Sequence, residues 1–187
     1  MNEVEAVSER MSSLTKSPFK VEAPERNNPL YDSKNLRWFV ICPYVEYHNQ
    51  TAHAQVVWED NQDNLWLESS ILGFVSDWIK RDYGEEAVVK FMNMESHDFS
   101  NPQFRQRLAK KFPATMSRFS RYNSIASEVS SRRHVQLRMR YDSSDKVAMI
   151  TMGAKIEIKG MDLQSKLKAI ETNVRALKET YQEITDL

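Results

Sequence analysis

Two histidines stand in similar short motifs, HAQV at 53–56 and HVQL at 134–137. In each motif the histidine is followed by an apolar residue, a glutamine and a second apolar residue, and each lies in a predicted strand. Two facing imidazoles could act as general base and general acid on a phosphodiester, because the unperturbed pKa of histidine is near neutral. His53 and His134 are therefore candidate catalytic residues. The competing interpretation is that both are outward-facing residues of strands.

Together with the apolar opening stretch LRWFVI at 36–41, the two motifs resemble those of the two-histidine phosphoesterases. That family carries two His-x-Thr/Ser-x motifs on symmetric strands and cleaves RNA or cyclic phosphates, so the resemblance implies catalysis by His53 and His134. Here Gln55 and Gln136 stand where the family has a hydroxyl residue, and no helix is expected before the first motif. A degenerate phosphoesterase is therefore an alternative hypothesis, and we expect a protein that is not an enzyme.

A strongly basic segment, residues 104–140, is the main candidate for binding. It contains ten lysines and arginines and one acid, Glu128, so its net charge is +9 in a chain whose total is zero. Such a concentration of like charge is costly unless a polyanion or an acidic surface neutralises it. Eight of the ten are arginines, whose planar guanidinium groups suit bidentate phosphate recognition. The candidate nucleic-acid-binding residues are Lys110, Lys111, Arg118, Arg121, Arg132, Arg133, Arg138 and Arg140.

Part of this segment forms a row on a predicted strand, at positions 134, 136, 138 and 140. Alternate strand residues repeat at about 6.5–7 Å, near the spacing of successive phosphates. Nearby aromatic residues that could stack on unpaired bases are Phe119, Tyr122 and Tyr141. The chain has no aromatic signature of a sequence-reading RNA sheet. We therefore expect weakly specific contacts to the backbone, with RNA favoured over DNA.

The preceding segment, residues 59–98, has the opposite charge. Its ten acids and three cations give a net charge of −7. Two accounts remain open. The acidic and basic surfaces could face each other within the fold or between subunits, as in a scaffold or assembly subunit that meets an acidic partner. Alternatively, the acidic half is a solvated exterior while the basic half contacts a phosphate backbone.

Composition excludes several other classes of function. The only cysteine, Cys42, lies in an apolar run, which predicts a buried residue in an intracellular, cytoplasmic protein, with the nucleus also compatible. No stretch approaches 18 apolar residues, so no membrane partner is expected. The four histidines are dispersed, and no phosphate-binding glycine loop is present, so neither a metal nor a cofactor is predicted.

The predicted fold class is α+β, with three regions along the chain. Residues 1–35 form a disordered, flexible arm in which Val4, Val7, Met11 and Leu14 could form a helix on a partner. Residues 36–160 form the α+β core. Its antiparallel sheet comes from two hairpins, one over 38–58 and one over 134–158 with a bulge at Gly153.

Central helices are predicted between the two hairpins. The first begins at Asp63 or Asn64 and ends at Gly84, because apolar residues at 67, 71, 74, 75 and 78 form one stripe. Others span 85–93, follow Pro102, and follow Pro113.

The third region, 161–187, is a long amphipathic helix capped by Asp162. Its apolar residues follow an unbroken 4-3 spacing, which favours an intermolecular coiled coil; the alternative is a helix that covers the sheet of its own chain. Lys166 and Glu171 could then pair across a parallel dimer. The predicted oligomerisation residues are Leu163, Leu167, Ile170, Val174, Leu177, Tyr181 and Ile184.

These observations lead to one functional hypothesis. We expect a self-associating nucleic-acid-binding protein of the packaging or sequestering type, such as a viral nucleocapsid-like or RNA-shielding protein. Association of subunits would add avidity to weak backbone contacts.

Overall fold

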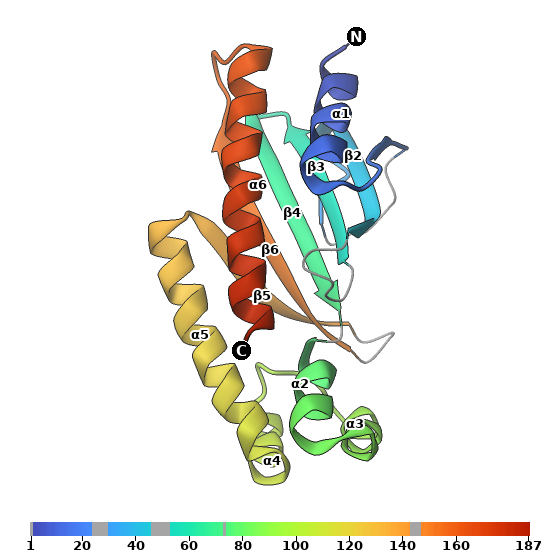
Figure 1. Ribbon diagram of the computed structural model, residues 1–187, viewed down its shortest axis with the longest axis vertical. Coiled ribbons are helices and arrows are strands. Elements are labelled where there is room, and N and C mark those ends of the chain that lie inside the picture. The colour runs from blue at the N-terminus through green and yellow to red at the C-terminus, as the bar shows by residue number, and fades with distance from the viewer. Residues whose placement is uncertain (1, 24–29, 46–52, 73, 143–146) are drawn as a thin grey trace.

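A computed structural model describes residues 2–23, 30–45, 53–72, 74–142 and 147–187, and at 53, 71, 72, 74, 138–142, 147–149 and 185 it describes only the backbone. The fold is α+β, as predicted. A six-stranded antiparallel sheet has the order β1-β2-β3-β4-β6-β5 (Figure 1). The strands are β1 (Lys20–Val21), β2 (Leu36–Val45), β3 (His53–Asp60), β4 (Asn64–Leu72), β5 (Val135–Asp142) and β6 (Val147–Glu157).

Two helices, α1 (Glu3–Thr15) and α6 (Leu163–Thr185), cover one face of the sheet (Figure 1). Four further helices lie between β4 and β5 in the chain. Their bounds are α2 (Phe74–Tyr83), α3 (Glu85–Met92), α4 (Pro102–Lys111) and α5 (Pro113–Arg132). The helices α2 to α4 gather beyond one end of the sheet, and α5 runs back along its β5 edge.

The hairpin predicted over 134–158 forms, with β5 paired to β6. Tyr141 pairs with Ala148 and Leu137 pairs with Met152, so the apolar faces of β5 and β6 coincide. The bulge expected at Gly153 is absent, since the pairing with both neighbouring strands continues through it. The strand begins at Val135, because His134 has a left-handed φ of 55°.

The helix predicted from Asp63 to Gly84 is wrong in its first half, which forms β4. Leu65, Leu67 and Ser69 are buried under the helices, and the residues between them face the other side. This alternation of buried and outward residues has the period of a strand. The helical spacing of apolar residues applies only to the second half of the predicted segment, which forms α2. Asp63, expected as a helix cap, has φ 60° in the turn that joins β3 to β4.

The flexible arm predicted for residues 1–35 is also wrong where the structure describes it. Val7 and Met11 of α1 are fully buried in the main core. Arg10 forms a salt bridge with Glu171 of α6 at 2.5 Å, and the Lys178 ammonium donates to the Leu14 carbonyl at 2.7 Å. Residues 24–29 of the predicted arm lie outside the described residues. The amphipathic helix expected around Val4, Val7, Met11 and Leu14 is therefore α1, and it packs against α6 and the sheet of the same chain.

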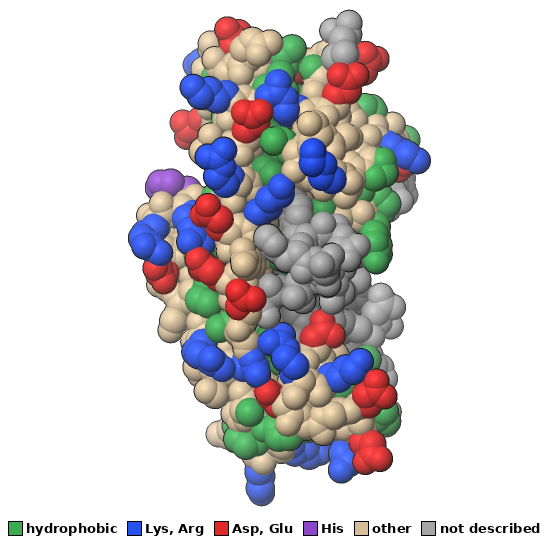
Figure 2. Space-filling view, in the orientation of Figure 1, with side chains coloured by type: hydrophobic (Ala, Val, Ile, Leu, Met, Phe, Trp, Pro, Cys, Tyr) green, Lys and Arg blue, Asp and Glu red, His purple; other side chains and the backbone are tan. Residues whose placement is uncertain are grey.

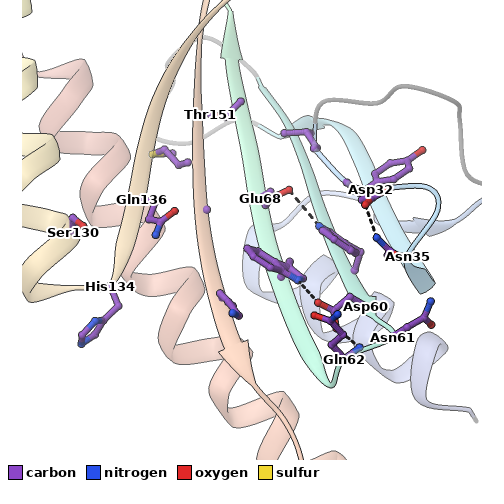
Figure 3. A pocket seen from close by; sticks show the side chains of 17 residues that line it. Asp32, Asn35, Asp60, Asn61, Gln62, Glu68, Ser130, His134, Gln136 and Thr151 are labelled. Carbon is purple, nitrogen blue, oxygen red and sulfur yellow. Dashed lines mark hydrogen bonds between the residues drawn. The ribbon is translucent and has the colours of Figure 1, made fainter.

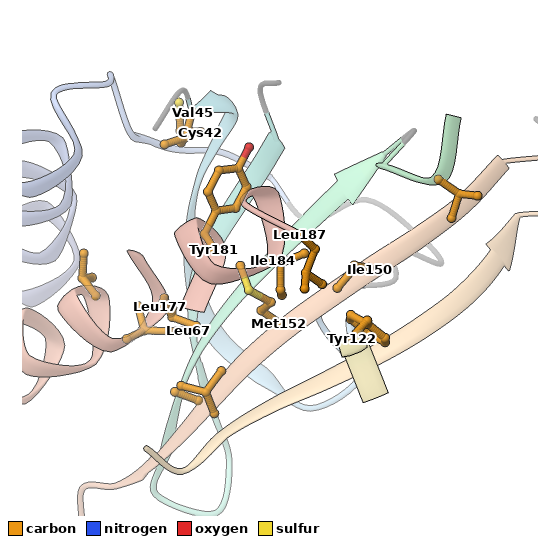
Figure 4. Close-up of a cluster of buried hydrophobic side chains, with 14 of the residues drawn as sticks. Cys42, Val45, Leu67, Tyr122, Ile150, Met152, Leu177, Tyr181, Ile184 and Leu187 are labelled. Atoms are coloured by element: carbon orange, nitrogen blue, oxygen red, sulfur yellow. The ribbon is translucent and has the colours of Figure 1, made fainter. Parts of the chain in front are cut away.

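The intermolecular role predicted for the α6 seam is wrong for the same reason. Its residues from Leu167 to Ile184 are at most 5% exposed within the subunit, and Leu163 packs against the same core (Figure 4). Lys166 and Glu171, expected to pair between subunits, instead contact Glu3 and Arg10 of α1. A side chain buried against its own sheet is not available to a second helix, so α6 is the cover of the sheet.

Candidate binding surfaces

Exposed lysines and arginines lie on α4 and the first half of α5, and we call this group the basic surface. It belongs to the lower end of the molecule, where Figure 2 shows lysine and arginine side chains together with acidic and hydrophobic ones. Five of its cations are exposed, and none forms a salt bridge with an acid that the structure describes. They are Arg105, Arg107, Lys110, Lys111 and Arg121. Buried Phe104 and Leu108 hold α4 against the core, so the cations on its other sides face solvent. Arg105 and Arg107 were not among the sequence candidates, although they lie in the same basic segment.

The sixth cation of this region, Arg118, forms a salt bridge with an acid of the segment 59–98. Its guanidinium donates to both carboxylate oxygens of Asp82, each at 2.7 Å, and both side chains are 17% exposed. The hydrogen bonds from Arg118 hold the pKa of Asp82 below its ordinary value. Arg118 therefore joins α5 to α2.

Two further candidates at the end of α5 also have acidic partners. Arg132 forms a salt bridge with Glu128, one turn earlier in the same helix. Arg133 donates to Glu183 of α6 at 2.5 Å, and its side chain is 20% exposed. Arg133 thus ties α5 to α6. Of the three arginines, Arg118 alone pairs with an acid of the acidic segment 59–98, since Glu128 lies in the basic segment and Glu183 lies in α6.

The last two candidates, Arg138 and Arg140, lie in the part of β5 whose backbone alone is described, residues 138–142. Their strand partners are Thr151 and Met149 of β6. Whether their side chains extend the predicted row stays a prediction. Of the aromatic residues expected to stack on bases, Phe119 and Tyr122 are buried, and burial raises the pKa of the Tyr122 phenol. They belong to the core, and the Tyr141 side chain lies outside the described residues.

The strand register does not bring His53 and His134 together. His53 pairs with Ile71, Ile71 with Ile150, and Ile150 with Met139, which is five residues beyond His134. Three strand spacings and five residues along the strand separate the two backbones by roughly 20 Å. This distance is too large for two imidazoles to act on one phosphodiester, which needs contacts of about 3 Å. The side chain of His53 is not described, and no step is assigned to it.

A second candidate surface is a hollow of about 900 Å³ on the face of the sheet that α1 and α6 do not cover (Figure 3). We call it the sheet groove. It is lined by residues of β3, β4 and β6, by His134 and Gln136, and by Tyr31 and Asp32 from the segment before β2. Three of its lining residues, Glu68, Gly153 and Gln136, lie side by side on β4, β6 and β5. A Cβ at Gly153 would lie in van der Waals contact with the Glu68 side chain, at 3.4 Å.

Two stacked tryptophans form one wall of the sheet groove. The rings of Trp58 and Trp66 are 5.5 Å apart and nearly parallel, at 9°. Each indole N–H donates to a carboxylate, Trp58 to Glu68 at 3.3 Å and Trp66 to Asp60 at 3.0 Å (Figure 3). The Lys155 ammonium lies 5.6 Å from the centre of the Trp66 ring, within the range of a cation–π contact.

Asp60 is the best-anchored acid of the sheet groove. Its two oxygens accept hydrogen bonds from the backbone of Gln62 and of Asn64, from the Asn64 amide and from the Trp66 indole. Burial opposes its ionisation, but these four donors outweigh burial and lower the pKa of Asp60 to about 2. Asp60 is therefore charged at neutral pH and holds both the β3–β4 turn and the Trp66 ring.

Cys42 is buried, as predicted, and its thiol lies 3.3 Å from the Tyr44 carbonyl oxygen. Among the described residues, no group of three or more histidine, cysteine or acidic side chains is placed to hold a metal ion. Within the same residues, no helix has the length and apolar character needed to cross a membrane.

Comparisons with known proteins place the chain near one solved structure. No protein family and no curated protein matches it. It is similar to a protein described as an uncharacterized protein from Methanothermobacter thermautotrophicus. The sequence identity is 11%, the match covers 99% of this chain and 98% of that chain, and the TM-score is 0.47. A similarity of this degree carries no argument about function.

Proposed function

We propose that the protein binds the phosphate backbone of nucleic acid through the basic surface of α4 and α5. The observation that supports this proposal is the group of five exposed cations that form no salt bridge with an acid among the described residues. Arginines that serve the fold, such as Arg118 and Arg133, have carboxylates within hydrogen-bonding distance. Cations left without such partners add self-repulsion, and a polyanion relieves it.

The arrangement favours backbone contacts without sequence reading. Arg107, Lys110 and Lys111 lie within one and a half turns of α4, so they can reach neighbouring phosphates along a strand. Phe119 and Tyr122, the described aromatic candidates in the basic segment, are buried, which leaves no ring of theirs to stack on a base. We propose RNA as the polymer that is bound, and the affinity for DNA of the same sequence is the comparison.

The test replaces Arg107, Lys110 and Lys111 by Gln together. The triple variant should bind a fluorescently labelled 20-nucleotide RNA about ten-fold or more weakly in an anisotropy titration at low salt, because three phosphate contacts are lost. Glutamine favours helix, so circular dichroism should be unchanged.

The matched control removes three exposed cations elsewhere, by the substitutions Lys159→Gln, Lys168→Gln and Arg175→Gln. It has the same change in net charge and should bind RNA within two-fold of the unmodified protein. Equal loss in both triple variants would mean that only net charge matters. If the unmodified protein binds no RNA and instead co-purifies with an acidic protein, the basic surface is a protein-binding site.

A further inference from the structure

An aromatic side chain from outside the basic segment lies beside the basic surface. It is Tyr83, the last residue of α2, and it is 38% exposed. Its phenol oxygen accepts a hydrogen bond from the backbone N–H of Ala114, in the first turn of α5, at 2.9 Å. Its ring contacts the ring of Phe112, the residue between α4 and α5, with 5.4 Å between the centroids and 61° between the planes. Tyr83 therefore lies at the junction of the two helices that carry the basic surface.

These two contacts fix the Tyr83 ring and leave part of it open to solvent. The hydrogen bond holds the hydroxyl end, and the two rings pack edge to face. Phe112 is only 5% exposed, so it lies on the inner side of the tyrosine ring. A ring whose position is already set by the fold loses little conformational entropy when a ligand stacks on it. Exposed tyrosine rings of this kind stack on the unpaired bases of single-stranded nucleic acid, because every base has a π face.

Three acids lie close to Tyr83 in the chain, and cations offset two of them. The acids are Asp82, Glu85 and Glu86. Arg118 of α5 donates to both carboxylate oxygens of Asp82, each at 2.7 Å. Lys80 forms a salt bridge with Glu85 at 3.3 Å. Glu86 is exposed on α3 and is not offset in this way.

Further cations lie around the same junction. The hydrogen bonds from Arg118 and the charges of Arg81 and Arg121 lower the pKa of Asp82, which places these guanidinium groups near the residue that precedes Tyr83. The last two residues of α4, directly before Phe112, are Lys110 and Lys111. The cations around the junction therefore outnumber the acids. A phosphate chain that follows α4 and α5 passes the exposed ring.

We propose that Tyr83 stacks on an unpaired base, so that the nucleic acid on the basic surface is single-stranded. The inference rests on the proposed binding of nucleic acid by this surface, and it adds a contact to a base to the contacts with phosphates. Stacking on a ring accepts any base, which agrees with a surface that does not read sequence. A base inside a duplex is stacked on its neighbours, so a duplex would be held through its phosphates alone.

The first measurement compares two ligands on the unmodified protein. One is a fluorescently labelled 20-nucleotide RNA of uridine, and the other is the same ribose-phosphate chain without bases. Both have the same length and charge, so they offer the same phosphate contacts. The uridine RNA should bind about ten-fold more tightly at equal salt, because one stacked base contributes about this much. Equal affinity would overturn the inference and leave phosphate binding in place.

Variants then assign the difference to one ring. Tyr83→Leu keeps an apolar side chain against Phe112 and should weaken binding of the uridine RNA about ten-fold, while the affinity for the abasic chain stays within two-fold. Tyr83→Phe keeps the ring, loses the hydrogen bond to Ala114 and should bind both ligands within about three-fold of the unmodified protein. The matched control is Tyr44→Leu, which removes a ring that is 68% exposed on β2 and should change neither affinity.

Two comparisons separate this inference from the proposed function. If Tyr83→Leu weakens binding of both ligands equally, Tyr83 only supports α5 and the inference is wrong. The triple variant of Arg107, Lys110 and Lys111 should weaken binding of both ligands, since it removes phosphate contacts. Unchanged binding of both ligands by that variant would refute the phosphate site and, with it, the inference. Circular dichroism shows which variants fold, and the comparison of the two ligands on the unmodified protein needs no variant.

Discussion

At the scale of residues, Asp60 shows how one carboxylate can organise a turn and a ring together. The carboxyl group closes the β3–β4 turn through Gln62 and Asn64 and orients Trp66 in the sheet groove. A buried acceptor that satisfies four donors cannot be replaced without leaving some of them unpaired. Asp60 is therefore a structural residue whose loss would disturb the groove indirectly.

We expect Asp60→Asn to lower the free energy of unfolding by about 1–3 kcal/mol at pH 7, because an amide presents one acceptor oxygen to four donors. The pKa of Asp60 is about 2 in the folded state against 3.8 for an ordinary aspartate. Since the folded pKa is the lower one, this stabilisation is present above about pH 4 and is lost as the pH falls towards 2. Urea unfolding at pH 7 and at pH 2.5 should show the gap between the two proteins narrowing in acid; a gap independent of pH would contradict the assignment.

The Arg118–Asp82 pair is the second residue-scale feature that can be measured. Its two hydrogen bonds are short, and both side chains are largely shielded from solvent. A double-mutant cycle with Arg118→Gln and Asp82→Asn should give a coupling energy of about 1–3 kcal/mol in urea unfolding. The exposed pair Arg132–Glu128 is the control, and its coupling should be below about 0.5 kcal/mol. Similar values for both pairs would mean that Arg118 does not join α5 to α2.

At the scale of elements, α1 is the part whose role differs most from expectation. Its apolar residues pack into the main core, and its polar residues form salt bridges with α6. Deleting side chains from such a helix must cost stability, whereas deleting them from a flexible arm would not.

We expect Met11→Ala to lower the free energy of unfolding by about 2–5 kcal/mol, because Met11 is completely buried. Glu9→Ala, at an exposed position of the same helix, should change it by less than about 0.5 kcal/mol. Urea denaturation followed by circular dichroism measures both. Equal and small effects of the two substitutions on the free energy of unfolding would indicate that α1 is a flexible arm.

The α6 seam leads to a prediction about concentration. If α6 covers the sheet of its own chain, the thermal midpoint should be the same at 1 and at 100 micromolar protein, whereas an obligate coiled coil would gain stability with concentration. Leu177→Ala should lower the unfolding free energy by about 2–5 kcal/mol without changing the mass in light scattering. A rise of the midpoint with concentration would show that folding and association are coupled.

At the scale of the whole molecule, a chain of zero net charge carries a basic surface. The basic surface lies on α4 and α5, and the sheet groove lies on the uncovered face of the sheet. Neutral total charge therefore does not imply weak electrostatics. The steepness of the salt response measures how many phosphate contacts the basic surface makes.

For RNA, five phosphate contacts would give a slope of log K against log salt of about −3.5, and fewer contacts a proportionally smaller slope. Titrations at four salt concentrations between 50 and 300 mM would measure it. The triple variant of α4 should flatten the slope by about 2, since three contacts are removed. A slope near zero in the unmodified protein would contradict backbone binding by the basic surface.

Local patterns determined several features that the structure confirms. The alternation over 135–141 and 148–152 sets which faces of the hairpin are apolar, and in the structure the apolar faces of the two strands coincide. The helices after Pro102 and Pro113 begin where proline starts a helix at no cost in hydrogen bonds. The amphipathic pattern of α6 is likewise local. Each of these signals arises among residues a few positions apart, so the sequence contains it.

Only the tertiary structure decided what each apolar face packs against and which charges are neutralised. The spacing of the α6 seam is compatible with a second helix or with a sheet, and the buried contacts with β4 and β6 select the sheet. The pairings of Arg118 with Asp82 and of Arg133 with Glu183 join residues 36 and 50 positions apart. The sheet groove likewise combines residues from 30 to 155. Contacts over such separations leave no local periodicity in the sequence. For that physical reason the net charge of each segment could be predicted from the sequence, whereas the basic surface and the sheet groove could not.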